Sequence, residues 1–303
     1  MFRRLLLPLD GSQLAEAALP VATRLAHAFD SRLLLLHVIE RKAPTTIHGE
    51  PHLTEVAAAE AYLQSVVTRL RDQQIEAEVH VHSVPLGDVA RSIADHAEEE
   101  RADLIVLCAH GRAGWRDLVA GSIAQQALQR GSVPLLLVHA AAPEQEPAVF
   151  QPADILVPLD GSAAAEAALP IAATLARALQ SQLHLVTVVA TPGTVTDKRA
   201  PATTLLPSAT RLLLEVEQDE AAVNLAGLAE RLRAEGVEVT TEVRRGDTTT
   251  QLSADNIEHQ FGLIVVTTHG RAGLPARLSG SVVARFVGKT SAPVLLIRRV
   301  DRE

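Results

Sequence analysis

The sequence predicts an α/β protein of two tandem, doubly wound domains, each a mostly parallel five-stranded sheet flanked by helices. Three observations predict this fold. The chain has 303 residues, about twice the length of an ordinary domain. Its short aliphatic runs alternate with helix-like segments, which is typical of βαβ units. Two sequence blocks also recur in the same order, which indicates a duplication.

The two recurring blocks define the copies. LLLPLDGSQLAEAALP begins at Leu5 and returns as ILVPLDGSAAAEAALP at Ile155, 150 residues later. LIVLCAHGRAGWRDLVAGS begins at Leu104 and returns as LIVVTTHGRAGLPARLSGS at Leu263, 159 residues later. The second copy therefore carries nine extra residues between the blocks. We expect them in the Thr- and Pro-rich stretch 190–207, which has the composition of a loop.

A short segment between the copies is rich in proline and acidic residues. It contains three prolines and two glutamates, which favour an extended linker. We therefore predict a first domain over residues 1–140, a linker over 141–152 and a second domain over 153–303.

The predicted strands are aliphatic runs at matching places in the two copies. Most are continuous rather than alternating, which is typical of strands covered on both faces. In the first copy they are Leu5–Leu7, Leu33–His37, Ala77–Ser83, Leu104–Cys108 and Leu135–His139, and in the second Ile155–Val157, Leu183–Val189, Glu238–Arg244, Leu263–Thr267 and Val294–Arg298. Segments with helical spacing, such as Ala15–Phe29 and Val56–Gln73, lie between them.

Composition excludes several classes of function. A formal charge of −8 and an aromatic content of 2% argue against nucleic-acid binding, which needs basic surfaces and stacking platforms. The single cysteine, Cys108, excludes an internal disulfide and a zinc site built from several cysteines. The apolar start is too brief for a signal peptide, and no apolar stretch would cross a bilayer. We expect a soluble, cytoplasmic protein with no nucleic-acid or membrane partner.

Two repeated motifs lie where the first and fourth predicted strands of each copy end. In a doubly wound sheet, ligands bind beyond these carboxyl ends. The first motif is the Pro-Leu-Asp-Gly-Ser turn, and the second is a glycine loop that leads into a helix. Glycines allow close backbone approach, and N–H groups at a helix start attract anions, so the loop suits a phosphate. The alternative is that the glycines only make a turn and the serines only cap a helix.

The arrangement resembles the universal stress protein family over nearly the whole chain. Members that bind nucleotides carry Gly-x-x-Gly, nine further residues, and a Gly followed by Ser or Thr. The last three positions are filled in both copies, by Gly111, Gly121 and Ser122 and by Gly270, Gly280 and Ser281. The leading glycine is replaced by Cys108 in the first copy and by Thr267 in the second.

The resemblance implies a Rossmann-like, adenine nucleotide alpha hydrolase-like fold that binds ATP or AMP, with Mg²⁺ accompanying ATP. It places Asp10 and Asp160 near the base and ribose, and Val38 and Val188 beside the adenine. The implied binding residues are Pro8, Leu9, Asp10, Val38, Leu107, Cys108, Gly111, Gly121, Ser122 and Ile123 in the first copy, and Pro158, Leu159, Asp160, Val188, Val266, Thr267, Gly270, Gly280, Ser281 and Val282 in the second.

Two functions from different classes remain open. The first is a stress-response module regulated by an adenine nucleotide. The second is a nucleotide-free stress scaffold that works through unidentified protein partners, which the two replaced glycines favour. We expect no catalytic residue, because no nucleophile with an activating base is visible, and any ATP hydrolysis should be slow. In relatives the last strands meet across a two-fold axis, which predicts an internal pseudo-dimer or a homodimer.

Several residues have both a functional and a simpler structural interpretation. Asp10 and Asp160 serve a ligand or only start a helix. His110 and His269 are expected to brace their loop rather than act in catalysis. His80 and His82 would share one face of a strand, as metal ligands can, but the sequence shows no third ligand with convincing spacing. We therefore expect an ordinary strand face there and no metal site.

Overall fold

A computed structural model of the chain describes residues 1–40, 44–47, 49–86, 88–109, 123–139, 150–195, 205–259, 261–268, 290 and 292–298. The chain separates into two compact units, each of the α/β class that the sequence predicts. The first contains Met1–Gln151 together with the last strand of the chain, and the second contains Pro152–Thr267.

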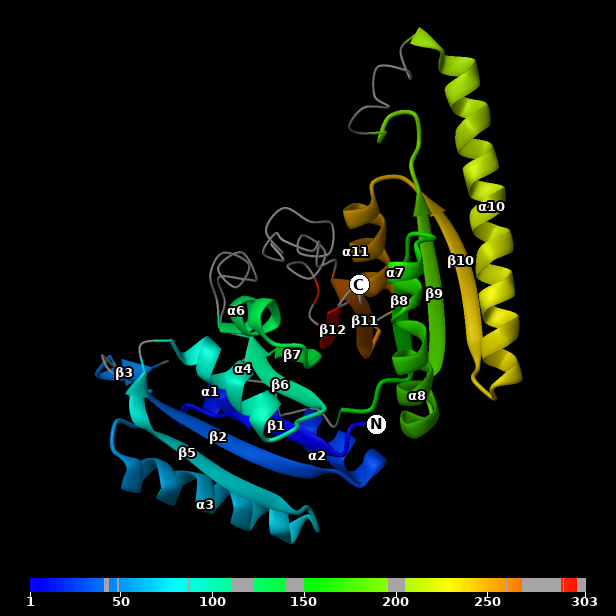
Figure 1. Cartoon of the computed structure of the whole chain (residues 1–303). Helices are drawn as coiled ribbons and strands as arrows, with labels where there is room; N and C mark the ends of the chain where they lie inside the picture. The colour runs from blue at the N-terminus through cyan, green and yellow to red at the C-terminus, as the bar shows by residue number, and fades with distance from the viewer. Residues whose placement is uncertain are drawn as a thin grey trace. The chain divides into compact units, whose positions relative to one another are not determined.

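The first unit alternates strands with helices around a mostly parallel sheet (Figure 1). Its strands are β1 (Arg4–Pro8), β2 (Arg32–Glu40), β5 (Ala77–Leu86), β6 (Leu104–Ala109), β7 (Leu135–His139) and β12 (Val294–Arg298), and a small hairpin is made by β3 (Thr46–Ile47) and β4 (Glu50–Pro51). Its helices are α1 (Gln13–Glu16), α2 (Leu19–Phe29), α3 (Val56–Asp72), α4 (Val89–Glu99) and α6 (Ile123–Arg130). Figure 1 shows α3 and α4 on opposite faces of this sheet.

The order of strands in the first unit is β5-β2-β1-β6-β7-β12. All neighbours are parallel except β7 and β12, which pair antiparallel. The chain moves outward from β1 to β2 and β5 and then returns to the other side of β1 to form β6. The strand order therefore reverses between β1 and β6, which is where open α/β sheets bind ligands.

The second unit repeats this plan with four described strands in the order β10-β9-β8-β11, all parallel. The strands are β8 (Asp154–Leu159), β9 (Gln182–Val189), β10 (Val239–Arg245) and β11 (Leu263–Thr268), and the helices are α7 (Ala163–Glu166), α8 (Leu169–Leu179), α10 (Pro207–Ala234) and α11 (Thr248–His259). β12, which the sequence predicts as the last strand of the second copy, is grouped with the first unit through its pairing with β7. The predicted domain boundaries and the internal pseudo-dimer stay predictions.

The two copies begin with the same local devices. Ser12 and Ser162 cap the first helices, each accepting a hydrogen bond of 3.1 Å from the backbone N–H three residues later. A proline follows in the first turn of both α2 and α8. Each of these helices ends on a left-handed residue, Asp30 with φ 53° and Gln180 with φ 58°. The sequence repeat is thus a repeat of caps and turns as well as of strands.

The expected loop insertion in the second copy is wrong. The segments between β2 and α3 and between β9 and α10 are of similar length, whereas α10 has 28 residues against 17 in α3. The extra residues therefore lengthen a helix. Figure 1 shows α10 running beside β9 and β10, with its first turns extending past the end of the sheet. The prediction was drawn to residues 190–207 by their Thr- and Pro-rich composition. The difference between the repeat offsets gives only the number of extra residues, and it does not say which element they lengthen.

The core is aliphatic, as the composition predicts, and it lies between the strands and the helices that cover them. The central residues of β1, Leu5, Leu6 and Leu7, are fully buried, as are those of β8. None of the helices in the described part of the chain combines the length and apolar character that a membrane span needs.

His139, at the end of β7, predicts a pH dependence of folding. Burial lowers its pKa to about 4, below the ordinary value of 6.5. Between these values the unfolded chain binds a proton that the folded chain excludes, so stability should be full above pH 6.5 and should fall towards pH 4. The loss is at most about 3 kcal/mol. Urea unfolding at pH 7.5 and pH 5 measures it.

The variant His139→Gln should lose less stability than the wild type between these two pH values. His27 is exposed on α2, so His27→Gln is the matched control and should keep the wild-type slope. Equal slopes in the wild type and His139→Gln would contradict the assignment.

Candidate functional site

A cavity of about 290 Å³ lies in the first unit at the carboxyl ends of β1, β2 and β6. This is the point where the strand order reverses, so the cavity is where the fold class places a ligand. Its volume is near the lower end of the range for small-molecule sites, and most of its lining is apolar.

Most of the residues predicted for the first copy line this cavity. They are Pro8, Leu9, Asp10, Val38, Leu107, Cys108 and Ile123. The other three, Gly111, Gly121 and Ser122, lie outside the described residues. The structure adds residues that the sequence did not single out, namely Ala15, Leu36, His37, Glu40, Ile47, His52, Val89, Ile93 and Ala124.

Asp10 both shapes the turn after β1 and lines the cavity. Its Oδ1 atom accepts hydrogen bonds from the backbone N–H of Ser12 at 2.9 Å and from the Ser12 hydroxyl at 2.6 Å. Ser12 in turn caps α1. The two alternatives for Asp10 are therefore compatible: the same carboxylate starts the helix and borders the cavity.

His37 ties the end of β1 to the segment around Leu53, which we call the covering segment. The residue is 2% exposed in the middle of an aliphatic strand. Its Nδ1 lies 2.8 Å from the carbonyl oxygen of Leu9, and its Nε2 lies 3.0 Å from that of Leu53. The imidazole thus bridges the end of β1 and the segment after the β3–β4 hairpin. The Leu53 side chain lies over Gly11, so this segment packs directly on the turn after β1.

His52 brings an unsatisfied polar atom to the cavity wall. Its Nε2 lies 3.8 Å from a carboxylate oxygen of Glu40, which also lines the cavity. Its Nδ1 is buried and has no hydrogen-bond partner within the described part of the chain. A buried polar atom without a partner is costly, so a polar ligand that reached this nitrogen would relieve that cost.

The starts of two helices, α4 and α6, border the cavity. Asp88 caps α4 by accepting a hydrogen bond of 3.0 Å from the Arg91 N–H, and it also pairs with Arg130 of α6. The Arg130 guanidinium holds the pKa of the Asp88 carboxyl below its usual range. The first residues of α6, Ile123 and Ala124, line the cavity, so the positive end of that helix faces it.

Cys108 stands in the cavity wall at the position of the missing glycine. It follows Leu107 near the end of β6, and the Cys108 and Leu107 side chains are 6% and 8% exposed. The thiol therefore occupies space that a glycine would leave open. His110 and the glycine loop that follows it lie outside the described residues, as does the loop of the second copy with His269, Gly270, Gly280, Ser281 and Val282.

The second unit places its predicted residues at equivalent strand ends. Pro158 and Leu159 end β8 and Asp160 follows, Val188 lies in β9, and Val266 and Thr267 lie in β11. Asp160 makes the same turn as Asp10, accepting from the Ser162 N–H at 3.0 Å and from the hydroxyl at 2.6 Å. Asp160 is exposed, however, whereas Asp10 is partly buried. The ends of β1 and β8 therefore make the same turn, but the aspartate of the turn is more exposed in the second unit.

Most of the residues that sequence reasoning missed come from β2, from the segment between β2 and α3, and from α4. A histidine inside the run LLLLHV was a visible signal, because a buried polar side chain in a strand needs partners. The sequence carried no comparable signal for His52 or Glu40, which meet only after β2 and the hairpin fold back on each other.

The doubly wound fold with a cavity at its switch point defines a class of ligand-binding α/β proteins. A model of the universal stress protein family matches residues 1–139 and again residues 153–298, so the chain belongs to that family as a tandem pair. A universal stress protein of Mycolicibacterium smegmatis is 25% identical over 300 residues, which cover 97% of this chain and 96% of that protein.

A shorter relative and a solved structure agree with this assignment. A universal stress protein from Thermus aquaticus is 34% identical over 146 residues, which cover all of that protein and 46% of this chain. The crystal structure of a universal stress protein from Archaeoglobus fulgidus superposes with a TM-score of 0.71 at 22% identity, covering 99% of this chain and 97% of that one. That likeness shows the fold.

The glycines after β1 and β8 provide a matched test of the covering segment. Gly11 has φ +93° and Gly161 has φ +76°, so alanine at either position should cost about 1–3 kcal/mol of stability. A methyl group at Gly11 would also lie 2.7 Å from Leu53 Cδ1, whereas at Gly161 it would meet no atom of the described residues within 4 Å. Gly11→Ala should therefore destabilise the protein more than Gly161→Ala, as measured by urea unfolding.

The double variant Gly11→Ala/Leu53→Ala separates the two causes of this loss. Removal of the Leu53 side chain should recover part of the extra loss by relieving the clash. If Gly161→Ala were the more destabilising change, the packing of the covering segment on Gly11 would be refuted.

Proposed function

We propose that this chain is a stress-response protein whose first unit binds an adenine nucleotide, ATP or AMP, as a regulatory ligand. The observation that carries the proposal is the cavity at the β1/β6 switch point. Every described residue that the family resemblance implies for the first copy lines it.

The chemistry of the lining supports a nucleoside. The side chains of Val38, Leu107 and Ile93 supply apolar walls for a base, and the Asp10 carboxylate is an acceptor for ribose hydroxyls. The buried Nδ1 of His52 would gain a hydrogen-bond partner from the base or the sugar. The start of α6 favours the negative charge of a phosphate, and Mg²⁺ would accompany ATP by bridging its phosphate oxygens.

Regulation by binding suits the site better than catalysis. The sequence shows no nucleophile with a dedicated activating base. We therefore expect ATP hydrolysis to be slow or absent. Second-copy binding is part of the same proposal, and the exposure of Asp160 favours weaker binding there than in the first unit.

Asp10→Asn tests the proposal without disturbing the turn. An asparagine keeps an oxygen that accepts from both the N–H and the hydroxyl of Ser12. It removes the charge that strengthens hydrogen bonds from the ribose, so the affinity for ATP should fall by about tenfold or more. The measurement is an equilibrium titration of ATP with and without Mg²⁺, preceded by heat release of any nucleotide that copurifies.

Asp160→Asn is the matched control, since Asp160 makes the same turn in the second unit. It should leave the tighter binding phase unchanged. Val38→Trp, which fills the first cavity, should abolish that phase, and Val188→Trp should not. The absence of copurified nucleotide, together with no saturable binding up to millimolar ATP, would overturn the proposal.

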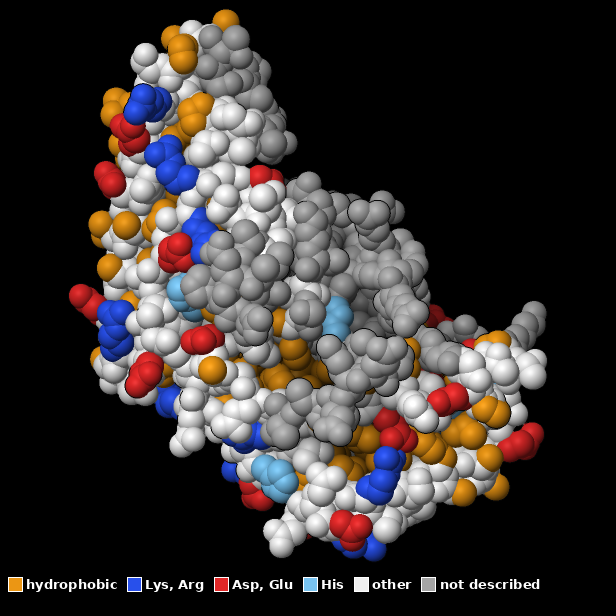
Figure 2. Space-filling view, turned by 180° about the vertical axis from the view of Figure 1, so that it is seen from behind, with side chains coloured by type: hydrophobic (Ala, Val, Ile, Leu, Met, Phe, Trp, Pro, Cys, Tyr) orange, Lys and Arg blue, Asp and Glu red, His pale blue; other side chains and the backbone are white. Residues whose placement is uncertain are grey.

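One observation favours the alternative of a scaffold that acts through protein contacts. The buried side chains of α10 face the sheet, but Leu212, Val216 and Val223 form a second apolar stripe on the opposite side of the helix. They are 63%, 45% and 74% exposed. Figure 2 shows hydrophobic side chains among charged ones along the edge of the molecule that α10 occupies. A negative result in the nucleotide titration would favour this alternative.

A further inference from the structure

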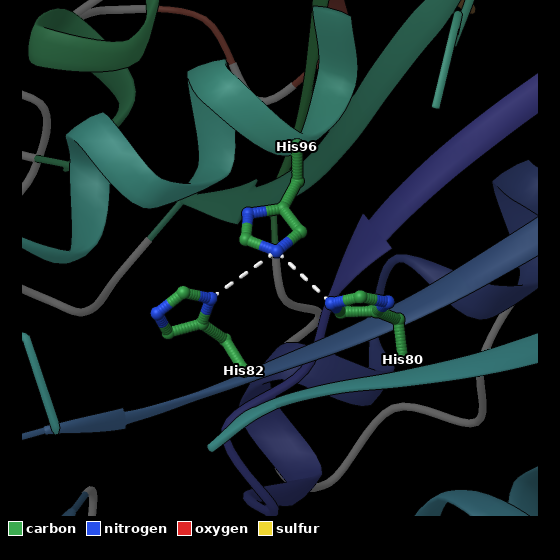
Figure 3. A group of neighbouring side chains, drawn as sticks. All are labelled: His80, His82 and His96. Carbon is green, nitrogen blue, oxygen red and sulfur yellow. Dashed lines mark hydrogen bonds between the residues drawn. The ribbon is translucent and has the colours of Figure 1, made fainter. Parts of the chain in front are cut away.

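Three histidines from two elements of the first unit converge at the edge of its sheet. His80 and His82 are two residues apart on the edge strand β5, so their side chains share one face. His96 lies in the last turn of α4, the helix that follows β5 and packs over that face. Figure 3 shows the three rings turned toward one another.

The spacing of their nitrogens is that of a metal site. The Nε2 of His96 lies 3.0 Å from the Nε2 of His80 and 3.3 Å from the Nδ1 of His82. One nitrogen from each ring can be chosen so that all three lie within 4.8 Å of one another. Tetrahedral ligands at a Zn–N distance of 2.0–2.1 Å are about 3.3 Å apart, so two edges of the triangle already fit. The third edge, between His80 and His82, is within 4.8 Å.

The tautomer of His96 directs a lone pair into this triangle. Its Nδ1 lies 2.7 Å from the Ser92 carbonyl oxygen, which only an N–H can approach. In the neutral ring, Nε2 therefore carries the lone pair. A second nitrogen that donates to a backbone carbonyl is the usual support of a metal-bound histidine. One lone pair accepts one good hydrogen bond, so a cation satisfies three converging rings better than the rings satisfy each other.

The local charges also favour a cation. Burial, and next the neighbouring His96, lower the pKa of His80 and of His82, which is the direction that favours the neutral form a metal ligand requires. The negative charge of Glu99 acts on both rings in the opposite direction, and Glu100 does so on His80. These carboxylates, at the end of α4, supply negative potential without occupying the triangle.

The second unit shows that the fold does not need histidines at this contact. By sheet register, Glu242 and Arg244 of β10 replace His80 and His82. Their side chains form an ion pair at 3.1 Å, and Arg244 donates to the Gln251 carbonyl oxygen of α11 at 3.2 Å. The chain has a Gly-Asp pair at 87–88 and another at 246–247, and eight residues after each aspartate stand His96 and Asp255 in the sequence. The same strand–helix contact is thus built in one unit from an ion pair and in the other from three imidazoles.

We propose that His80, His82 and His96 bind one divalent transition-metal ion per chain, with Zn²⁺ as the best match. Three imidazole ligands suit Zn²⁺ and its neighbours rather than Mg²⁺ or Ca²⁺, which require oxygen ligands. Three protein ligands leave a fourth position for water or another ligand, and the partly exposed His80 and His82 leave a path for entry. This site is separate from the nucleotide cavity, so its test is independent of the proposed function.

The experiment is a Zn²⁺ titration of the full chain, produced without a histidine tag, stripped with a chelator and free of nucleotide. Binding is measured by competition with a chromophoric chelator, and the metal content by mass spectrometry. We expect one Zn²⁺ per chain with a dissociation constant of about 1 μM or tighter. His82→Gln and His96→Gln should each weaken binding by more than about tenfold, whereas exposed His27→Gln should not change it.

Two further readouts keep the result unambiguous. Zn²⁺ should raise the unfolding temperature of the wild type but not of His82→Gln, which alters only a partly exposed edge-strand side chain. X-ray absorption of the zinc-loaded chain should show three imidazole nitrogens. The proposal is overturned if the wild type fails to bind Zn²⁺ at about 100 μM, if the three variants bind equally, or if the metal is held mainly by oxygen.

Discussion

The parallel pairing of buried strands is the constraint on which the rest of the first unit depends. Parallel strands require crossover helices, and those helices cover both faces of the sheet. Because the chain continues from β1 to β2 on one side and from β6 to β7 on the other, no connection crosses the gap between β1 and β6 at their carboxyl ends. The turn after β1 and the start of α6 therefore meet at one point, and the cavity follows from that geometry.

Much of this arrangement could be predicted from the sequence because it is local or repeated. The aliphatic runs predicted the strands, and the duplicated Asp-Gly-Ser turn predicted a helix start, which the hydrogen bonds of Ser12 and Ser162 confirm. The family resemblance predicted cavity residues at three strand ends, because parallel strands bring their ends to one edge. Each of these inferences needs only the residues themselves and the topology.

The rest depends on contacts that sequence spacing does not encode. His52 reaches Glu40 only because the β3–β4 hairpin folds back over the end of β2. His96 reaches His80 and His82 because the turn between β5 and α4 reverses the chain, so a ligand 14 residues beyond the strand pair becomes their neighbour. The i, i+2 spacing of His80 and His82 describes neighbours on one strand, and it says nothing of a ligand that a second element brings. The length of α10 was missed for a related reason, since a repeat offset counts residues without assigning them to elements.

One helix joins the two sites of the first unit. Val89 and Ile93, near the start of α4, line the cavity, and His96 lies about one turn further along the same helix. Asp88, which caps this helix, is also tied to Arg130 of α6, the helix whose start faces the cavity. A cation bound by His96 and β5 would hold the far end of α4 against the sheet edge, while Asp88 holds the near end against α6. Because a helix is stiff over so few turns, both restraints act on one wall of the cavity, and the position of that wall decides how closely Val89 and Ile93 can pack on a ligand.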